Sequence, residues 1–184
     1  VDLAMFDANV QGPLGFRIDG PSSGAEAGRG IAGLGDLNGD GLADVALGAS
    51  GPGRAYVVFG KADPTPVDLA TFQDGATTGR GFVVETPAPG TNVDYSVGAA
   101  GDVNGDGIPD LIVGVQGDAG ARGAAFVVFG KTDGATINVS NGGLKGKGFK
   151  IVGAFSGSEA GHEVGGLEDV NEDGRDDVYV SAPA

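Results

Sequence analysis

The chain has 184 residues, 38 of them glycine, with no cysteine and a formal net charge of −14. This acidic balance disfavours nucleic acids and anionic membranes as partners, and the lack of cysteine excludes disulfides and thiolate zinc sites. No apolar run approaches the roughly 20 residues of a membrane-spanning helix. The glycines follow no collagen period and are interrupted by valine and phenylalanine clusters, which predicts an all-β chain of short strands and tight turns.

Short strands of four types recur along the chain. A small-residue strand runs into an acidic loop, an apolar strand leaves that loop, and two strands rich in β-branched and aromatic residues follow. None of these runs keeps helical periodicity for three turns, and four strands per unit is the blade of a β-propeller. In chain order the predicted strands include Gly15–Ile18 (fourth type), Gly81–Glu85 (fourth), Tyr95–Ala100 (first), Asp110–Val115 (second), Ala124–Phe129 (third), Gly148–Ile151 (fourth), Gly161–Leu167 (first) and Asp177–Ser181 (second).

The strands belong to a repeat with a period of 66 or 67 residues, measured between the starts of its three acidic loops. The third-type segment Tyr56-Val-Val-Phe-Gly-Lys61 recurs as Phe126–Lys131, but the last unit has no copy of it. A fixed long period is typical of repeat architectures, in which one unit cannot bury its own apolar face. We predict one repeat array with units of approximately 1–66, 67–136 and 137–184, the third being truncated.

Three blades are too few to close a ring, because propellers typically have 4–8. The sequence therefore predicts a partial propeller, or a ring closed by self-association as a homo-oligomer. Val1 to Val10 lack the basic start and apolar stretch of a signal peptide, so the sequence is that of a mature chain or of an excised piece. A piece with no function by itself is one interpretation of the incomplete last blade.

The acidic loops share the pattern D-x-N-x-D-G-x-x-D. Positions 1, 3 and 5 place three oxygen side chains around one turn, glycine at position 6 allows the turn, position 7 offers a carbonyl and Asp at position 9 completes the set. Hard oxygen donors of this number and charge favour Ca²⁺ over zinc or copper, and Mg²⁺ is the weaker candidate. Position 12, a bidentate Glu in EF-hands, is Leu47, Val113 or Val180, so the pattern predicts a strand–loop–strand calcium site.

These loops, with a small-residue strand before them and an apolar strand ending near Gly48-Ala-Ser50 or Ser181-Ala-Pro183 after them, resemble the FG-GAP repeat. That repeat builds the β-propeller head of integrin alpha chains and occurs in bacterial surface proteins. The glycine content and near-identical repeats favour a bacterial member. The resemblance implies one calcium ion in each loop, three in all, with ligands Asp36, Asn38, Asp40, Leu42 (backbone) and Asp44; Asp102, Asn104, Asp106, Ile108 (backbone) and Asp110; and Asp169, Asn171, Asp173, Arg175 (backbone) and Asp177.

Two functions are compatible with these features. The first is a non-enzymatic, calcium-dependent binding, adhesion or scaffold module for a protein or glycan ligand, with the longer loops Gly117–Gly123 and Thr132–Gly146 as candidate contact surfaces. A loop without a bidentate Glu is expected to bind calcium weakly, which favours an extracellular or cell-surface setting. The second is an accessory or catalytic domain of a polysaccharide-acting enzyme, for which the acids outside the loops (Glu85, Glu159, Glu163) and the single His162 are the candidates.

Overall fold

In a computed structural model of the chain, residues 15–72, 79–87, 95–140 and 142–183 are described. The first blade is an antiparallel sheet in which β2 (Ala27–Gly35), β3 (Asp44–Ala49), β4 (Arg54–Val58) and β6 (Gly81–Glu85) follow one another. A short strand from the next unit, β10 (Ile137–Asn138), extends its outer edge by pairing parallel with β6. The blade therefore includes strands on both sides of the unit boundary at residues 66 and 67.

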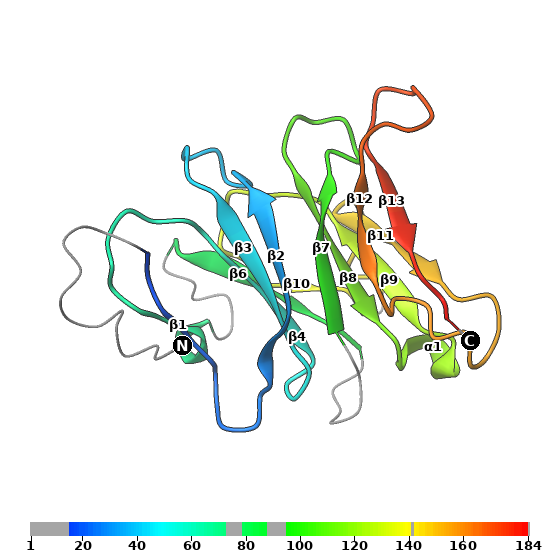
Figure 1. The fold of residues 1–184 in the computed structure, drawn as a ribbon, viewed down its shortest axis with the longest axis horizontal. Helices are drawn as coiled ribbons and strands as arrows, with labels where there is room; N and C mark the ends of the chain where they lie inside the picture. The colour runs from blue at the N-terminus through cyan, green and yellow to red at the C-terminus, as the bar shows by residue number, and fades with distance from the viewer. Residues whose placement is uncertain (1–14, 73–78, 88–94, 141, 184) are drawn as a thin grey trace.

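The second blade repeats this order, with β7 (Tyr95–Gly101), β8 (Asp110–Val115), β9 (Ala124–Val128) and β11 (Gly148–Val152) as its first to fourth strands. The last blade has two described strands, β12 (Val164–Leu167) and β13 (Asp177–Val180). The predicted strand types and their order are thus confirmed from β7 to β13, and the described strands form no closed ring (Figure 1). The predicted fourth-type strand Gly15–Ile18 is wrong, because only Ile18 lies in a strand, the two-residue β1 (Ile18–Asp19), which joins no blade.

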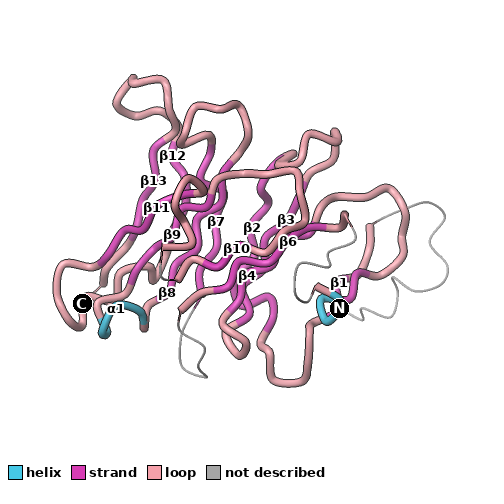
Figure 2. Tube along the Cα trace, turned by 180° about the vertical axis from the view of Figure 1, so that it is seen from behind, coloured by secondary structure: helices cyan, strands magenta, loops and turns pink. Residues whose placement is uncertain are grey.

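The remaining elements are short. β1 (Ile18–Asp19) pairs parallel with β5 (Val67–Asp68), which leads into the 3₁₀ turn η2 (Leu69–Thr71). The one α-helix of the described chain, α1 (Asp118–Ala121), lies inside the predicted loop 117–123. Both η2 and α1 are short and lie outside the sheets (Figure 2). None of the described helices has the length and apolarity to cross a membrane.

The second and third strands of the first two blades are largely buried on both faces, because other segments pack against each side of these sheets. The largest apolar cluster lies between the first two blades and joins residues such as Val57 and Phe82 to Leu111 and Phe126. A smaller cluster, including Ile112 and Val127, covers the opposite face of the second blade toward β12. Phe126 of β9 thus packs between the first two blades, whereas Tyr56 of β4 packs on the other face of the first blade, in a cluster with Phe72. Burial on both faces explains the near-continuous apolar character of the third strands.

Close approach of the first strands explains why they consist of small residues. β2, β7 and β12 run side by side, one from each blade (Figure 1). A methyl group at Gly30 of β2 would lie 2.7 Å from the carbonyl oxygen of Tyr95, well inside van der Waals contact. The blades can therefore pack at this distance only where the facing strand has no side chain.

A pair of substitutions within β2 tests this contact. We expect Gly30→Ala to destabilise the chain by about 1–3 kcal/mol, because the added methyl group forces the first and second blades apart. Gly33→Ala is the matched control, since a methyl group at Gly33 has no atom within 4 Å and its φ is not positive. Urea denaturation of both variants checks the difference. Equal stabilities would show that the blades are not held at this spacing.

Candidate metal-binding loops

The first acidic loop joins β2 to β3 and is organised around the side chain at position 1. One carboxylate oxygen of Asp36 accepts the amides of Gly39 (2.8 Å) and Asp40 (3.0 Å), and the other accepts that of Gly41 (2.8 Å). Gly39 and Gly41 have φ of 78° and 87°, a left-handed conformation that glycine adopts at little cost. The Asn-Gly-Asp-Gly sequence therefore folds back over its own first aspartate.

Positions 3 and 5 lie in the same turn. The amide of Asp40 donates to the Asn38 side-chain oxygen (2.9 Å) as well as to Asp36, so these two oxygens share one donor. The Asn38 Nδ2 contacts Asp40 Oδ2 at 3.0 Å, and the other oxygen of Asp40 accepts the amide of Leu42 at 2.8 Å. The predicted side chains at positions 1, 3 and 5 are thus brought together.

The second loop has the same geometry. All six hydrogen bonds of the first loop recur among Asp102, Asn104, Asp106 and their neighbours, with each length within 0.1 Å of its counterpart. Two separate sequences with the same motif therefore form one and the same loop.

The third loop keeps the turn but differs in two contacts. Asp169 accepts the amides of Asp173 (3.0 Å) and Gly174 (2.7 Å), as in the other loops. The Asn171 oxygen still accepts the amide of Asp173 (2.9 Å), but its Nδ2 donates to Asp177 at 3.3 Å and not to the carboxylate at position 5. Position 4 is Glu172, held at φ 62° where the other loops have glycine.

The strained residue of the third loop provides a second prediction. A non-glycine residue in the left-handed region costs about 1 kcal/mol, so Glu172→Gly is expected to stabilise the chain by about 0.5–1 kcal/mol despite the greater freedom of glycine in the unfolded state. The reciprocal change Gly39→Glu in the first loop should destabilise by a similar amount. Chemical denaturation of the two variants checks the opposite signs, and a destabilising Glu172→Gly would contradict the assigned strain.

The aspartate at position 9 is buried in the complete blades. Asp110 is fully buried, and its two oxygens accept the amides of Val103 (3.0 Å) and Gly130 (2.8 Å). Burial raises the pKa of this carboxyl to about 6, and the charges of Asp106 and Asp102 also raise it, while the amide hydrogen bonds act in the opposite direction. This side chain therefore ties the loop to the end of the third strand, a structural role that the sequence did not indicate.

The first loop repeats this arrangement. Asp44 is buried and accepts the amides of Leu37 and Gly60 at 2.8 and 2.7 Å. Its pKa is raised by burial and, to a lesser degree, by the charge of Asp40. The carboxylates at positions 5 and 9 thus lie close enough to repel each other, which gives each loop a strongly negative potential.

The donor chemistry of the loops fits a hard cation such as calcium. Within the described residues, no three His, Cys, Asp or Glu side chains gather closely enough to hold a metal ion by themselves. A site in these loops would therefore have to use asparagine and backbone oxygens besides carboxylates, as the motif predicts. One oxygen of Asp36 and of Asp102 already accepts two amides, and the second oxygen of each, which accepts one, retains a lone pair for a cation.

The second and third loops are joined directly. The carboxylate of Asp176 accepts the backbone amide of Asp102 at 2.7 Å, and the Asp176 amide donates to the carbonyl of Asp102 at 3.2 Å. The Arg175 side chain extends toward the second loop, so that a methyl group at Gly105 would lie 3.7 Å from its Nε. Asp176 occupies position 8 of the motif, which is Ala43 in the first loop and Pro109 in the second. The aspartate at this position is therefore the one sequence feature that could have indicated the contact.

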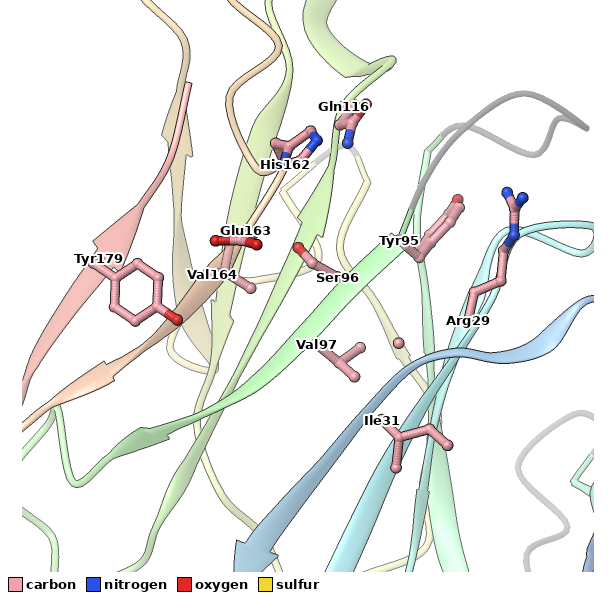
Figure 3. A pocket seen from close by; sticks show the side chains of 11 residues that line it. Arg29, Ile31, Tyr95, Ser96, Val97, Gln116, His162, Glu163, Val164 and Tyr179 are labelled. Carbon is pink, nitrogen blue, oxygen red and sulfur yellow. The ribbon is translucent and has the colours of Figure 1, made fainter. Parts of the chain in front are cut away.

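His162 and Glu163 line an open pocket over the first strands. Residues of three blades surround it, with Arg29 from β2, Tyr95 from β7 and Tyr179 from β13 among them (Figure 3). Among the described residues that line this pocket, Glu163 is the one carboxylic acid, whereas glycosidic hydrolysis generally uses two. Of the other candidate acids, Glu85 forms an ion pair with Arg54 at 2.9 Å on the first blade.

Four-stranded antiparallel blades, each with an Asp/Asn loop between its first and second strands, define an all-β repeat protein of the propeller-blade class. Residues 36–113 match the family described as FG-GAP-like repeat. This segment includes the first two acidic loops, so this part of the chain consists of FG-GAP-like repeats.

The curated relatives are integrin alpha chains. The chain is 34% identical over 96 residues to integrin alpha-IIb of Mus musculus, 35% over 94 residues to integrin alpha-7 of Rattus norvegicus, and 30% over 91 residues to integrin alpha-6 of Gallus gallus. Each alignment covers 48–50% of this chain but only 7–8% of the relative. The resemblance predicted from the motifs is thereby confirmed for the repeats.

Proposed function

We propose that the chain is a calcium-binding β-propeller segment that serves as an extracellular binding or adhesion module and not as an enzyme. The observation that carries this proposal is the identical hydrogen-bonded geometry of the first two acidic loops, which differ in sequence and lie on different blades. A turn that serves only to reverse the direction of the chain does not require oxygen-bearing side chains at positions 1, 3 and 5 in both loops. Integrin alpha relatives support an adhesion-type role.

In this proposal each ion is held by the side chains at positions 1, 3 and 5, by the carbonyl at position 7 and by the aspartate at position 9. Calcium accepts 6–8 oxygen ligands in flexible geometry, which suits a mixed carboxylate, amide and carbonyl set. The bound ion supplies positive charge that offsets the repulsion among the loop carboxylates. The loop geometry that a partner would meet on this face then depends on calcium.

The binding surface is proposed to lie on the loops that join strands, because such segments tolerate variation. The segments 117–123 and 132–146 stay the candidates, with a protein or glycan as ligand. Self-association is a further proposal for how a ring could be completed, since the described strands form two four-stranded blades and one two-stranded blade without a closed ring.

Calorimetric titration of metal-free protein tests the calcium proposal. We expect saturable binding of Ca²⁺ with dissociation constants of about 10⁻⁴–10⁻³ M, as in extracellular modules, and weaker binding of Mg²⁺. Asp102→Asn should remove one binding equivalent, because the first aspartate organises its loop. Asp133→Asn, an exposed aspartate outside the loops, is the control. No binding heat at 10 mM calcium would refute the proposal.

A further inference from the structure

Asp176 of the third loop holds the backbone of Asp102, the residue at position 1 of the second loop. One oxygen of the Asp176 carboxylate accepts the amide of Asp102 at 2.7 Å, and the Asp176 amide donates to the Asp102 carbonyl at 3.2 Å. Both backbone polar groups of Asp102 are therefore engaged by one residue that lies 74 positions further along the chain. Since these hydrogen bonds use the backbone, the Asp102 carboxylate is left to organise the second loop.

The Asp102 carboxylate determines how the second loop folds. Its two oxygens accept the amides of Gly105 (2.8 Å), Asp106 (3.0 Å) and Gly107 (2.8 Å). Asp102 is also the residue at position 1 of the proposed ligand set. A displacement of its backbone would therefore move one proposed ligand together with the amides that fold the loop around it.

The Asp176 carboxylate fits closely against Gly101, the last residue of β7. A methyl group at Gly101 would lie 2.2 Å from Oδ2 of Asp176 and 2.6 Å from its Cβ. Gly35 is the counterpart of Gly101 at the end of β2, and a methyl group there would meet no atom within 4 Å. The two glycines share a positive φ, of 71° and 77°, so the difference between them is the carboxylate that packs against the second loop.

The first loop cannot form the same connection to the second. Position 8 of the second loop is Pro109, which has neither a backbone N–H nor a carboxylate. It can therefore form with Asp36 neither of the two hydrogen bonds that Asp176 forms with Asp102. The second and third loops are thus connected through position 8, and the first loop, which has the geometry of the second, serves as an internal reference.

The third loop is less completely hydrogen-bonded than its neighbour. Four of the six hydrogen bonds of the first two loops recur in it, and Glu172 is held at a φ of 62°. Asp176 lies between Arg175 and Asp177, which supply the ligands at positions 7 and 9 of the proposed site. An ion that binds both of these residues would fix the backbone on either side of Asp176, and with it the two hydrogen bonds to Asp102.

We propose that Asp176 couples cation binding in the second and third loops, so that an ion in one loop raises the affinity of the other. This inference rests on the calcium binding proposed above. Asp176 acts as a positioning residue that binds no ion: a filled third loop holds Asp176, and Asp176 holds Asp102 in place for the second ion. Coupling between two binding sites is reciprocal, so a filled second loop favours binding in the third by the same factor.

The sign of the effect separates this coupling from electrostatics. A bound Ca²⁺ makes the third loop less negative, so a filled third loop attracts a cation in the second loop less than an empty one does. Charge alone would therefore make the two loops weaken each other. The hydrogen bonds of Asp176 act in the opposite direction, because they keep the second loop in its folded geometry when the third loop is filled.

Calcium titration of the isotope-labelled chain, followed by nuclear magnetic resonance, measures the affinity of each loop separately. The probes are the amides of Gly41, Gly107 and Gly174, which occupy position 6 and donate to the position 1 carboxylate of their own loop. Asp102→Asn disables the second loop and Asp169→Asn the third. We expect the connected loop that fills at the higher calcium concentration to bind about fivefold more weakly when the other is disabled. The affinity reported by Gly41 should be the same in each variant.

Two variants of Asp176 assign the coupling to its side chain. In Asp176→Ala, disabling one loop should no longer weaken the other. Asp176→Asn should retain most of the coupling, because its side-chain oxygen still accepts the Asp102 amide although the charge is lost. Amide shifts outside the loops verify that each variant is folded. If Asp176→Ala fails to fold, the parent chain and the two loop variants still determine the sign of the coupling.

The possible failures can be told apart. Equal affinity of a loop with and without its neighbour, mutual weakening of the two loops, or full coupling in Asp176→Ala would each overturn this inference, even though calcium still shifts the Gly41 amide. Unchanged shifts of all three glycine amides in 10 mM calcium would overturn the calcium proposal and this inference with it.

Discussion

Asp110→Ala is expected to destabilise the chain by about 2–5 kcal/mol in metal-free buffer. The carboxylate is fully buried and accepts the amides of Val103 and Gly130, so its removal leaves two buried donors without a partner. Asp110→Asn should have a smaller effect, because its side-chain oxygen still accepts one of the two amides. Urea denaturation monitored by circular dichroism measures the free energies of unfolding.

The matched control for this prediction is Asp177→Ala in the last blade. Asp177 occupies the same motif position but is half-buried and accepts a single backbone amide, that of Val170. Its removal should cost no more than about 1 kcal/mol under the same conditions. If the two alanine variants had equal stabilities, burial at position 9 would not be the source of the effect, and the structural role assigned to Asp110 would be wrong.

Chelation is expected to produce the second large effect, a fall in the melting temperature that excess calcium reverses. Three bound ions would change the formal net charge from −14 to −8 and remove repulsion among the loop carboxylates. A ligand at ten times its dissociation constant stabilises by about 1.4 kcal/mol per site, hence by roughly 4 kcal/mol for three sites. For a chain of this size that corresponds to a shift of about 8–16 °C.

Differential scanning calorimetry with 5 mM EDTA, and then with calcium in excess, measures this shift. Magnesium at the same concentration is the control for ionic strength and should restore less of the melting temperature. The triple variant with asparagine at Asp36, Asp102 and Asp169 should melt at the same temperature with and without calcium. An unchanged melting temperature of the parent chain in EDTA would contradict the calcium proposal.

The sequence by itself determined the local structure. In the second blade the four strand types lie where the pattern predicted them, with β8 matching the predicted range Asp110–Val115 and β9 ending one residue earlier than predicted. The prediction was poorer at Gly15–Ile18, of which only Ile18 lies in a strand, and β12 begins at Val164 and not at Gly161. The turns of the acidic loops could likewise be predicted from the sequence, because Asp, Asn and Gly at fixed spacing form similar local hydrogen bonds in each copy. These features depend on residues within a few positions of one another, so a single repeat contains the information for them.

Only the tertiary structure decided how the repeats meet. In the first two blades the fourth strand comes from the following sequence unit and the position 9 aspartate contacts the end of the third strand, and Asp176 joins the last two loops. The physical reason is that these contacts are set by close packing between distant segments: a side chain at Gly130, for example, is excluded by the carbonyl of Pro109 in another part of the sheet. The motif showed which oxygens each loop contains, and packing decided which of them were buried and paired with backbone amides.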